Sequence, residues 1–120
     1  MNKTYDLHGA ESLIPLLRVI QREIGERKSA IRNLSKRIQG IDFDFARPES
    51  LRRAEVTNLQ AEAATHRKEI RLAAAELERL GCAFDTSDPR TVHIPGANGT
   101  HEHGYTWRVG QAQISELATE

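Results

Sequence analysis

The sequence predicts a mainly α protein of the α+β class, in which a long antiparallel two-helix hairpin of coiled-coil type precedes a small antiparallel β-sheet. Two stretches, residues 7–39 and 48–80, repeat apolar side chains at steps of three and four, the period of packed helices. Residues 81–120 hold five of the eight glycines and three of the five histidines, which indicates strands and turns. Because 120 residues are one domain's worth, we expect residues 1–120 to form a single domain.

The first helix is predicted from an apolar seam over residues 7–39. The seam consists of Leu13, Leu17, Ile20, Ile24, Ile31, Leu34 and Ile38, with Arg27 as its polar member. Gly40 is expected to end the helix, since glycine favours the position that follows a helix. Pro15 either opens the main helix or kinks it after a short first turn capped by Asp6, and the sequence leaves both possibilities open.

The second helix is predicted over residues 48–80. It opens at Pro48-Glu49, where proline suits the first helical position and an acid suits the helix dipole, and it ends at Gly81. Its seam consists of Val56, Leu59, Ala63, His66, Ile70, Ala73, Leu77 and Leu80. The alternating steps of three and four again predict one narrow packing stripe.

A short connection, residues 41–47, makes the two helices antiparallel neighbours. Folding the chain at this loop predicts that Arg27 lies opposite Ala63 and that His66 lies opposite Ile24. A lone histidine or arginine in such a seam is most often a packing residue that fixes the register.

The tip of the hairpin carries Asp42 and Asp44 between aromatic residues. Two acids at the end of a long helical arm are also found in transcript-cleavage factors, but this likeness is one of fold alone. We expect an ordinary turn in which Phe43 and Phe45 tuck inward and the acids face water.

The C-terminal part offers four short runs that read as strands, residues 82–85, 91–94, 105–109 and 112–115. Turn residues separate them, among them Asn98-Gly99 and Pro95-Gly96. We expect a small antiparallel sheet packed on the open end of the hairpin. Its predicted core is Phe84, Val92, Ile94, Tyr105, Trp107 and Val109.

Composition restricts the location and the partners that we expect for the chain. The net charge is zero, so nothing draws the whole chain toward nucleic acid or an anionic membrane. The single Cys82 permits no intrachain disulfide, the N-terminus carries no apolar signal core, and the longest apolar run, residues 13–17, is far below the ~20 residues of a membrane span. These features predict a cytoplasmic protein without a membrane partner.

No motif of catalysis is present: there is no Gly-rich phosphate loop, no Gly-x-Ser-x-Gly elbow and no His-Glu-x-x-His. We therefore expect no catalytic residue and no cofactor, and we lean against an enzyme. The alternative is a metal-binding protein or metal-dependent enzyme, with zinc or another divalent cation held by His93, His101 and His103. Their spacing matches no standard zinc pattern, so a solvated polar loop is the simpler interpretation.

Charge is distributed unevenly along the chain. Residues 27–53 carry eight bases against three acids, whereas residues 76–120 carry three bases against seven acids. Lys28, Arg32 and Lys36 follow one another at four-residue spacing and form a candidate interaction column. Trp107 is a further candidate interaction residue. Such a column could meet phosphate, but it equally suits a solvated helix face or an antiparallel dimer whose basic tips meet acidic ends.

The chain also resembles a known family on specific segments. Residues 13–17, Leu-Ile-Pro-Leu-Leu, match a Leu-Leu-Pro-like step into a long helix, and Leu80-Gly81 matches the end of the family's second helix. Residues 90–95 and 106–111 match its two strand motifs, a Gly-Leu-Val-Asp-Phe-Pro-like and a Cys-Trp-Lys-Leu-Gly-Glu-like segment. On these grounds the chain is similar to the uncharacterised bacterial family named domain of unknown function 2203.

This resemblance covers nearly the whole chain and implies a helical hairpin with a small β-module, but no established activity. The chain departs from the family pattern at His93 and Gln111, where acids are usual, and it has no counterpart of the family's terminal histidine near residues 114–117. A family site built from those polar groups would therefore be altered here.

A two-helix hairpin alone buries only one stripe of apolar surface. Leu16, Val19, Leu51 and Leu72 lie outside the main seam and widen it. We therefore predict a non-enzymatic interaction or scaffold protein that forms a homodimer through a four-helix bundle and meets an unknown protein partner. Nucleic-acid binding through the basic hairpin tip ranks third, after the metal site.

Overall fold

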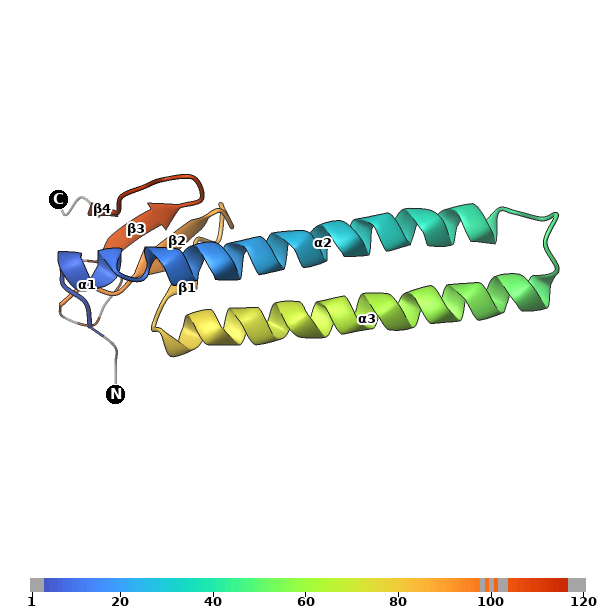
Figure 1. The fold of residues 1–120 in the computed structure, drawn as a ribbon, viewed down its shortest axis with the longest axis horizontal. Helices are drawn as coiled ribbons and strands as arrows, with labels where there is room; N and C mark the ends of the chain where they lie inside the picture. The colour runs from blue at the N-terminus through green and yellow to red at the C-terminus, as the bar shows by residue number, and fades with distance from the viewer. Residues whose placement is uncertain (1–3, 98, 100, 102–103, 117–120) are drawn as a thin grey trace. The chain divides into compact units, whose positions relative to one another are not determined.

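The computed structural model describes residues 4–97, 99, 101 and 104–116. Its elements, in chain order, are α1 (Leu7–Glu11), α2 (Ile14–Asp42), α3 (Glu49–Arg79), β1 (Ala83–Phe84), β2 (Thr91–Ile94), β3 (Tyr105–Arg108) and β4 (Ser115–Glu116). Figure 1 shows two long antiparallel helices, α2 and α3, and a small sheet that follows them in the chain. The predicted class, mainly α with a small antiparallel sheet, is confirmed.

The chain forms two compact units, which are described separately. One unit, the hairpin unit, spans Glu23–Ala73. The other, the sheet unit, combines Met1–Arg22 with Ala74–Glu120, so it holds α1, the sheet and the outer ends of α2 and α3. Within the described residues, no helix is long and apolar enough to cross a membrane.

The sheet unit begins with a capped turn of helix. The Asp6 carboxylate accepts the Gly9 N–H at 2.7 Å, and α1 ends after five residues. A new helix, α2, then starts at Ile14, which places Pro15 in its first turn, where the missing N–H costs no hydrogen bond. Both features named by the sequence are therefore present: a short capped turn and a proline that opens the main helix.

The hairpin unit packs along the predicted seam. Leu34, Leu59 and Ala63 form a buried cluster, against which Ile38 and Ile41 also pack. The seam positions that are buried in the two units are Leu17, Ile20, Ile24, Leu34, Leu59, Ala63 and Leu77. Their burial confirms that the steps of three and four mark the packed face of both helices.

The predicted register and the predicted end of the first helix are wrong. Ala63 packs with Leu34, and Arg27 Nη1 lies 3.1 Å from His66 Nδ1. Gly40 does not stop α2, which continues to Asp42. The reason is that Ile41 packs on the Leu34 cluster, and this burial outweighs the weak helix propensity of a glycine that touches nothing else. The longer helix moves the fold point toward the C-terminus.

The sheet has four antiparallel strands in the order β1-β2-β3-β4. Val92 lies opposite Trp107, and both are fully buried, as is Ile94. Phe84 and Tyr105 are half-buried, so five of the six predicted core residues do face the interior to some degree. The sixth prediction was wrong: Val109 is 44% exposed, because β3 ends at Arg108 and the chain turns at Gly110, which has a positive φ.

One glycine of the sheet unit is fixed by close backbone contact. Gly104 is buried directly before β3, and a Cβ built on it would lie 2.0 Å from the Ile94 carbonyl oxygen. No side chain fits at this distance from backbone, so the position admits glycine alone.

Gly104→Ala should therefore destabilise the sheet unit by about 1–3 kcal/mol, since the backbone of β2 or β3 must move. Denaturant unfolding followed by the fluorescence of the single tryptophan, Trp107, measures this loss. Gly25→Ala is the matched control, because nothing lies within 4 Å of its Cβ position on α2. That variant should gain about 0.5–1 kcal/mol from helix propensity, and equal effects of the two changes would contradict the packing described.

Candidate functional site

The most structured polar group in the sheet unit is a carboxylate–imidazole pair. His93 Nε2 donates to Asp85 Oδ1 at 2.8 Å, and both side chains are only about a quarter exposed. The pairing of β1 with β2 creates this contact, because Ala83 lies opposite His93 and Asp85 follows two residues later on the same side of the strand. His93 is recognisable as a candidate from the sequence, but its hydrogen bond to Asp85 follows only from the strand register.

The other carboxylate oxygen of Asp85 organises the turn between β1 and β2. Oδ2 accepts hydrogen bonds from the Ser87 N–H, the Ser87 hydroxyl and the Asp88 N–H, at 3.0, 2.6 and 2.9 Å. These bonds, first the Ser87 hydroxyl and next the His93 ring, hold the pKa of Asp85 far below its usual range. Asp85 therefore stays ionised and fixes both the turn and the imidazole.

Asp88 plays a similar role in the same connection between β1 and β2. Its carboxylate accepts from the Arg90 N–H and from the Thr91 hydroxyl, and Arg108 Nε lies 3.5 Å away. The backbone bond from Arg90 is the main reason that the pKa of Asp88 is lowered. The two acids thus serve the turn, with their oxygens already occupied by protein donors.

The structure describes the contacts of two of the three histidines proposed as metal ligands. His93 is paired with Asp85, while His101 Nε2 donates to the carbonyl of Gly81, two residues after the end of α3, at 2.7 Å. His103 lies outside the described residues. Among the residues that the structure describes, no group of three or more His, Cys, Asp or Glu side chains could hold a metal ion.

Cys82 is buried directly before β1, and burial raises its pKa to about 11. The thiol therefore remains protonated near neutral pH and is neither a ready nucleophile nor a ready ligand. Tyr5 lies nearby and donates its hydroxyl to the Leu80 carbonyl at 2.8 Å, so it caps α3. Both residues serve packing and the helix end.

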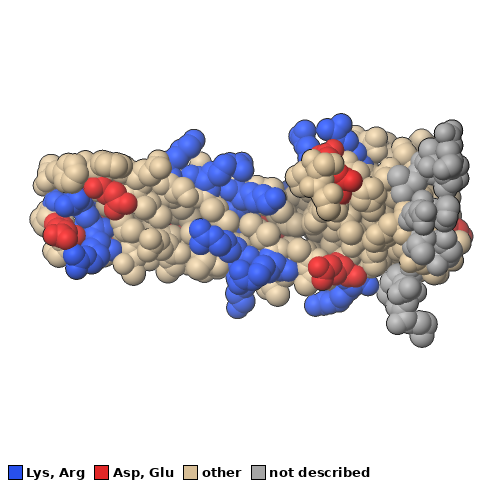
Figure 2. Space-filling model, turned by 180° about the vertical axis from the view of Figure 1, so that it is seen from behind, with Lys and Arg blue, Asp and Glu red and all other residues tan. Residues whose placement is uncertain are grey.

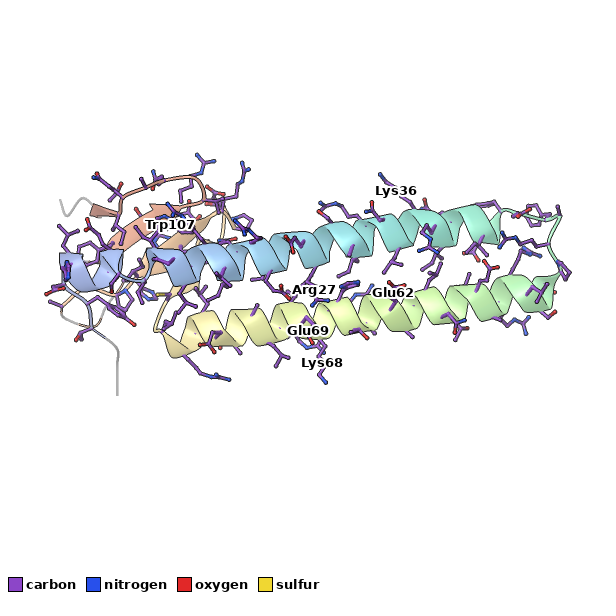
Figure 3. All side chains as sticks on the ribbon, viewed as in Figure 1. Arg27, Lys36, Glu62, Lys68, Glu69 and Trp107 are labelled. Carbon is purple, nitrogen blue, oxygen red and sulfur yellow. The ribbon has the colours of Figure 1, made fainter. Side chains whose placement is uncertain are left out.

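The seam of the hairpin unit includes a polar contact between its two helices. Arg27 Nε donates to Glu23 Oε1 at 2.9 Å on the same helix, and Arg27 Nη1 donates to His66 Nδ1 on α3. A guanidinium can only donate, so the His66 Nδ1 must accept and the ring proton is placed on Nε2. Figure 3 shows Arg27 reaching between the two helices. The group ties the helices together at one register, as the lone seam histidine suggested.

The tip of the hairpin is not the expected turn. Phe43 and Phe45 are 75% and 74% exposed, in contrast to the prediction that they tuck inward. Their rings contact each other edge to face at 6.5 Å, and the Arg52 guanidinium lies 5.2 Å above the Phe45 ring. Both rings belong to the connection of residues 43–48, which joins α2 to α3 outside the seam.

The three residues of the proposed interaction column, Lys28, Arg32 and Lys36, are all exposed on α2. A spacing of four residues advances about 40° around the helix at each step, so the column runs obliquely along the helix surface. Figure 3 shows Lys36 pointing away from α3. Trp107, also proposed for interaction, is fully buried with its indole N–H bound to the Gln111 carbonyl, so it belongs to the core of the sheet unit.

Residues 3–117 match the family described as "Uncharacterized conserved protein (DUF2203)". The chain belongs to this family. The resemblance noted from residues 90–95 and 106–111 is thereby confirmed. Comparisons with curated proteins and with solved structures gave no match.

The Asp85 network predicts an acid-sensitive sheet unit. Because the folded pKa of Asp85 is lowered, its contribution to stability is complete above the ordinary carboxyl pKa and is lost as the pH falls through and below that value. Denaturant midpoints read from Trp107 fluorescence should fall between about pH 5 and pH 3 in the wild type. Asp85→Asn should be less stable at neutral pH and show a flatter dependence over this range, and an unchanged slope would contradict the assignment.

Proposed function

We propose that the chain is a non-enzymatic interaction or scaffold protein of the cytoplasm, which acts through its helical hairpin as a homodimer with four bundled helices. The observation that supports this most directly is the exposure of Leu51 and Leu72, at 57% and 53%, on α3. The two residues are three heptads apart, so they lie on the same side of the helix, outside the seam with α2. Exposed leucines in such a repeat favour contact with another helix.

Among the described residues of the sheet unit, the acids of the turn and the single thiol are not placed for catalysis. The Asp85 and Asp88 carboxylates are occupied by turn donors, and Cys82 is buried with a raised pKa. The described side chains of the hairpin unit are exposed charges and a packed seam, which suit recognition of a surface. A protein partner beyond the second copy would therefore meet the hairpin rather than a cavity.

Sedimentation velocity at micromolar concentration tests the dimer, and we expect twice the mass of the chain. Each of Leu51→Ser and Leu72→Ser should weaken association by about tenfold, since burying a half-exposed leucine is worth about 1–1.5 kcal/mol. Val109→Ser is the matched control, because Val109 is similarly exposed but lies in the sheet unit. A wild-type monomer, or equal effects of all three changes, would contradict the proposal.

A second candidate is a metal site near His93. The Asp85 carboxylate fixes the His93 Nε2, an arrangement that commonly orients an imidazole whose other nitrogen binds metal. In this proposal His93 Nδ1, with His101 and His103, would be the ligands, and zinc or another divalent cation the ion.

Native mass spectrometry of the tag-free protein with added zinc tests this site. A stoichiometric zinc adduct that is lost in His101→Ala and His103→Ala would support it. His8→Ala is the control, because that histidine is exposed on α1 and belongs to no part of the proposed site. The absence of an adduct, or an adduct that survives both changes, would dismiss metal binding.

A further inference from the structure

The seam of the hairpin unit divides the surface of each helix into two edges. On an α-helix, the residues directly before and directly after a seam position lie about 100° to either side of it. On α3, the residues that precede Val56, Ala63 and Ile70 are all glutamates, Glu55, Glu62 and Glu69. The residues that follow His66 and Ile70 are arginines, Arg67 and Arg71. One edge of α3 is therefore acidic and the other basic.

Helix α2 shows the same separation. Glu23 and Glu26 precede the seam residues Ile24 and Arg27. Lys28 and Arg32 follow the seam residues Arg27 and Ile31. The order of acid before the seam and base after it is therefore common to both helices over this stretch.

Antiparallel packing places equivalent edges on the same side of the hairpin. Two surface hollows near the tip show this directly. One is lined by Arg37 and Glu55, which both precede a seam residue. The other is lined by Thr57 and Gln60, which both follow one, and by Asp42, which follows Ile41 of the packed cluster. The acidic edges of α2 and α3 therefore share one face of the hairpin unit, and the basic edges share the opposite face.

We define the basic face by Lys28, Arg32, Arg67 and Arg71, and the acidic face by Glu26, Glu62 and Glu69. All but the half-buried Glu69 are exposed. Within the part of the chain that the structure describes, none of the seven forms an ion pair. Figure 2, seen from the side opposite to Figure 1, shows Lys and Arg gathered over the middle of the hairpin, with acids near its tip.

We propose that the basic face of one hairpin stacks on the acidic face of a second copy of the chain. This inference rests on the proposed self-association and specifies how the four helices meet. The charge complementarity of the two faces carries it: a symmetric contact would oppose like charges, whereas a head-to-tail contact opposes unlike ones. The zero net charge of the chain removes any overall repulsion between copies.

A second copy fits the basic face better than nucleic acid does. The aromatic residues of the hairpin unit are Phe43 and Phe45, both at the tip, so the basic face offers no ring for a base to stack on. The rim of the acidic face carries Leu51 and Leu72, which lie four residues before Glu55 and three residues after Glu69. The apolar stems of lysine and arginine from the second copy would cover such leucines while their charges meet the glutamates.

A head-to-tail contact leaves one basic and one acidic face unused in every pair. Association should therefore continue beyond the dimer as concentration rises, unless the rotation between copies closes a ring. Because exposed charges are screened over about 10 Å at 0.1 M salt, the association constant should fall at least about tenfold between ~50 mM and ~500 mM sodium chloride.

Charge reversal tests the stack by sedimentation velocity at low salt. The double variant Arg67→Glu/Arg71→Glu cancels the charge of the basic face and leaves only the acidic face intact. The double variant Glu62→Lys/Glu69→Lys reverses the charge of the acidic face and leaves only the basic face intact; each variant alone should be monomeric. Mixed together, the two variants should associate again, because each then offers the face that the other lacks. Lys36→Glu/Lys68→Glu is the matched control: it changes the charge as much as the arginine variant, but Figure 3 shows both lysines pointing away from the partner helix.

The outcomes separate this inference from the proposed dimer. A dimer that resists salt and charge reversal but is weakened by Leu51→Ser would sustain the scaffold proposal and overturn the head-to-tail stack. A monomer at every salt concentration would overturn both. A monomer that binds a short DNA duplex at low salt, and loses that binding in Arg67→Glu/Arg71→Glu, would assign the basic face to nucleic acid instead.

Discussion

The contact between Arg27 and His66 fixes the register on which the hairpin's surface chemistry depends. The guanidinium donates to the imidazole across the seam and to Glu23 on its own helix, so its charge is compensated without leaving the interface. A shift of α3 by one turn would replace this pair by Arg27 against Ala63, where the guanidinium loses its acceptor on α3. A polar step in an otherwise apolar seam thus selects one register, at some cost in burial.

The register and phase of the seam also decide where the charges lie. Once Leu34, Leu59 and Ala63 are packed together, the residues on either side of each seam position are committed to one face or the other. On α3, Glu62, Arg67 and Arg71 are exposed and Glu69 is half-buried, so their separation is no requirement of folding. It is instead a property of the surface, which is why we interpret it as a contact surface for a second copy.

The periodic parts of the molecule were predictable from the sequence, and the local geometry was not. Steps of three and four gave both helices and most of their buried positions, because burial follows helical period directly. The predicted register is wrong because Gly40 does not end α2: Ile41 gains burial when the helix continues. Phe43 and Phe45 lie beyond the end of this longer helix and stay exposed, which the apolar character of their rings alone does not predict.

In the sheet unit, too, the sequence identifies candidate residues but not the local geometry that pairs them. The histidines could be found by composition, but the partner of His93 depends on strand register, and Asp85 is recognised only once Ala83 is known to lie opposite His93. The structure also assigns a role to the two acids. The carboxylates of Asp85 and Asp88 accept hydrogen bonds from Ser87, Arg90 and Thr91, so they hold the connection between β1 and β2 in place. The acids of this turn are therefore engaged within the sheet unit, whereas the charges of the basic and acidic faces of the hairpin unit form no ion pair among the described residues.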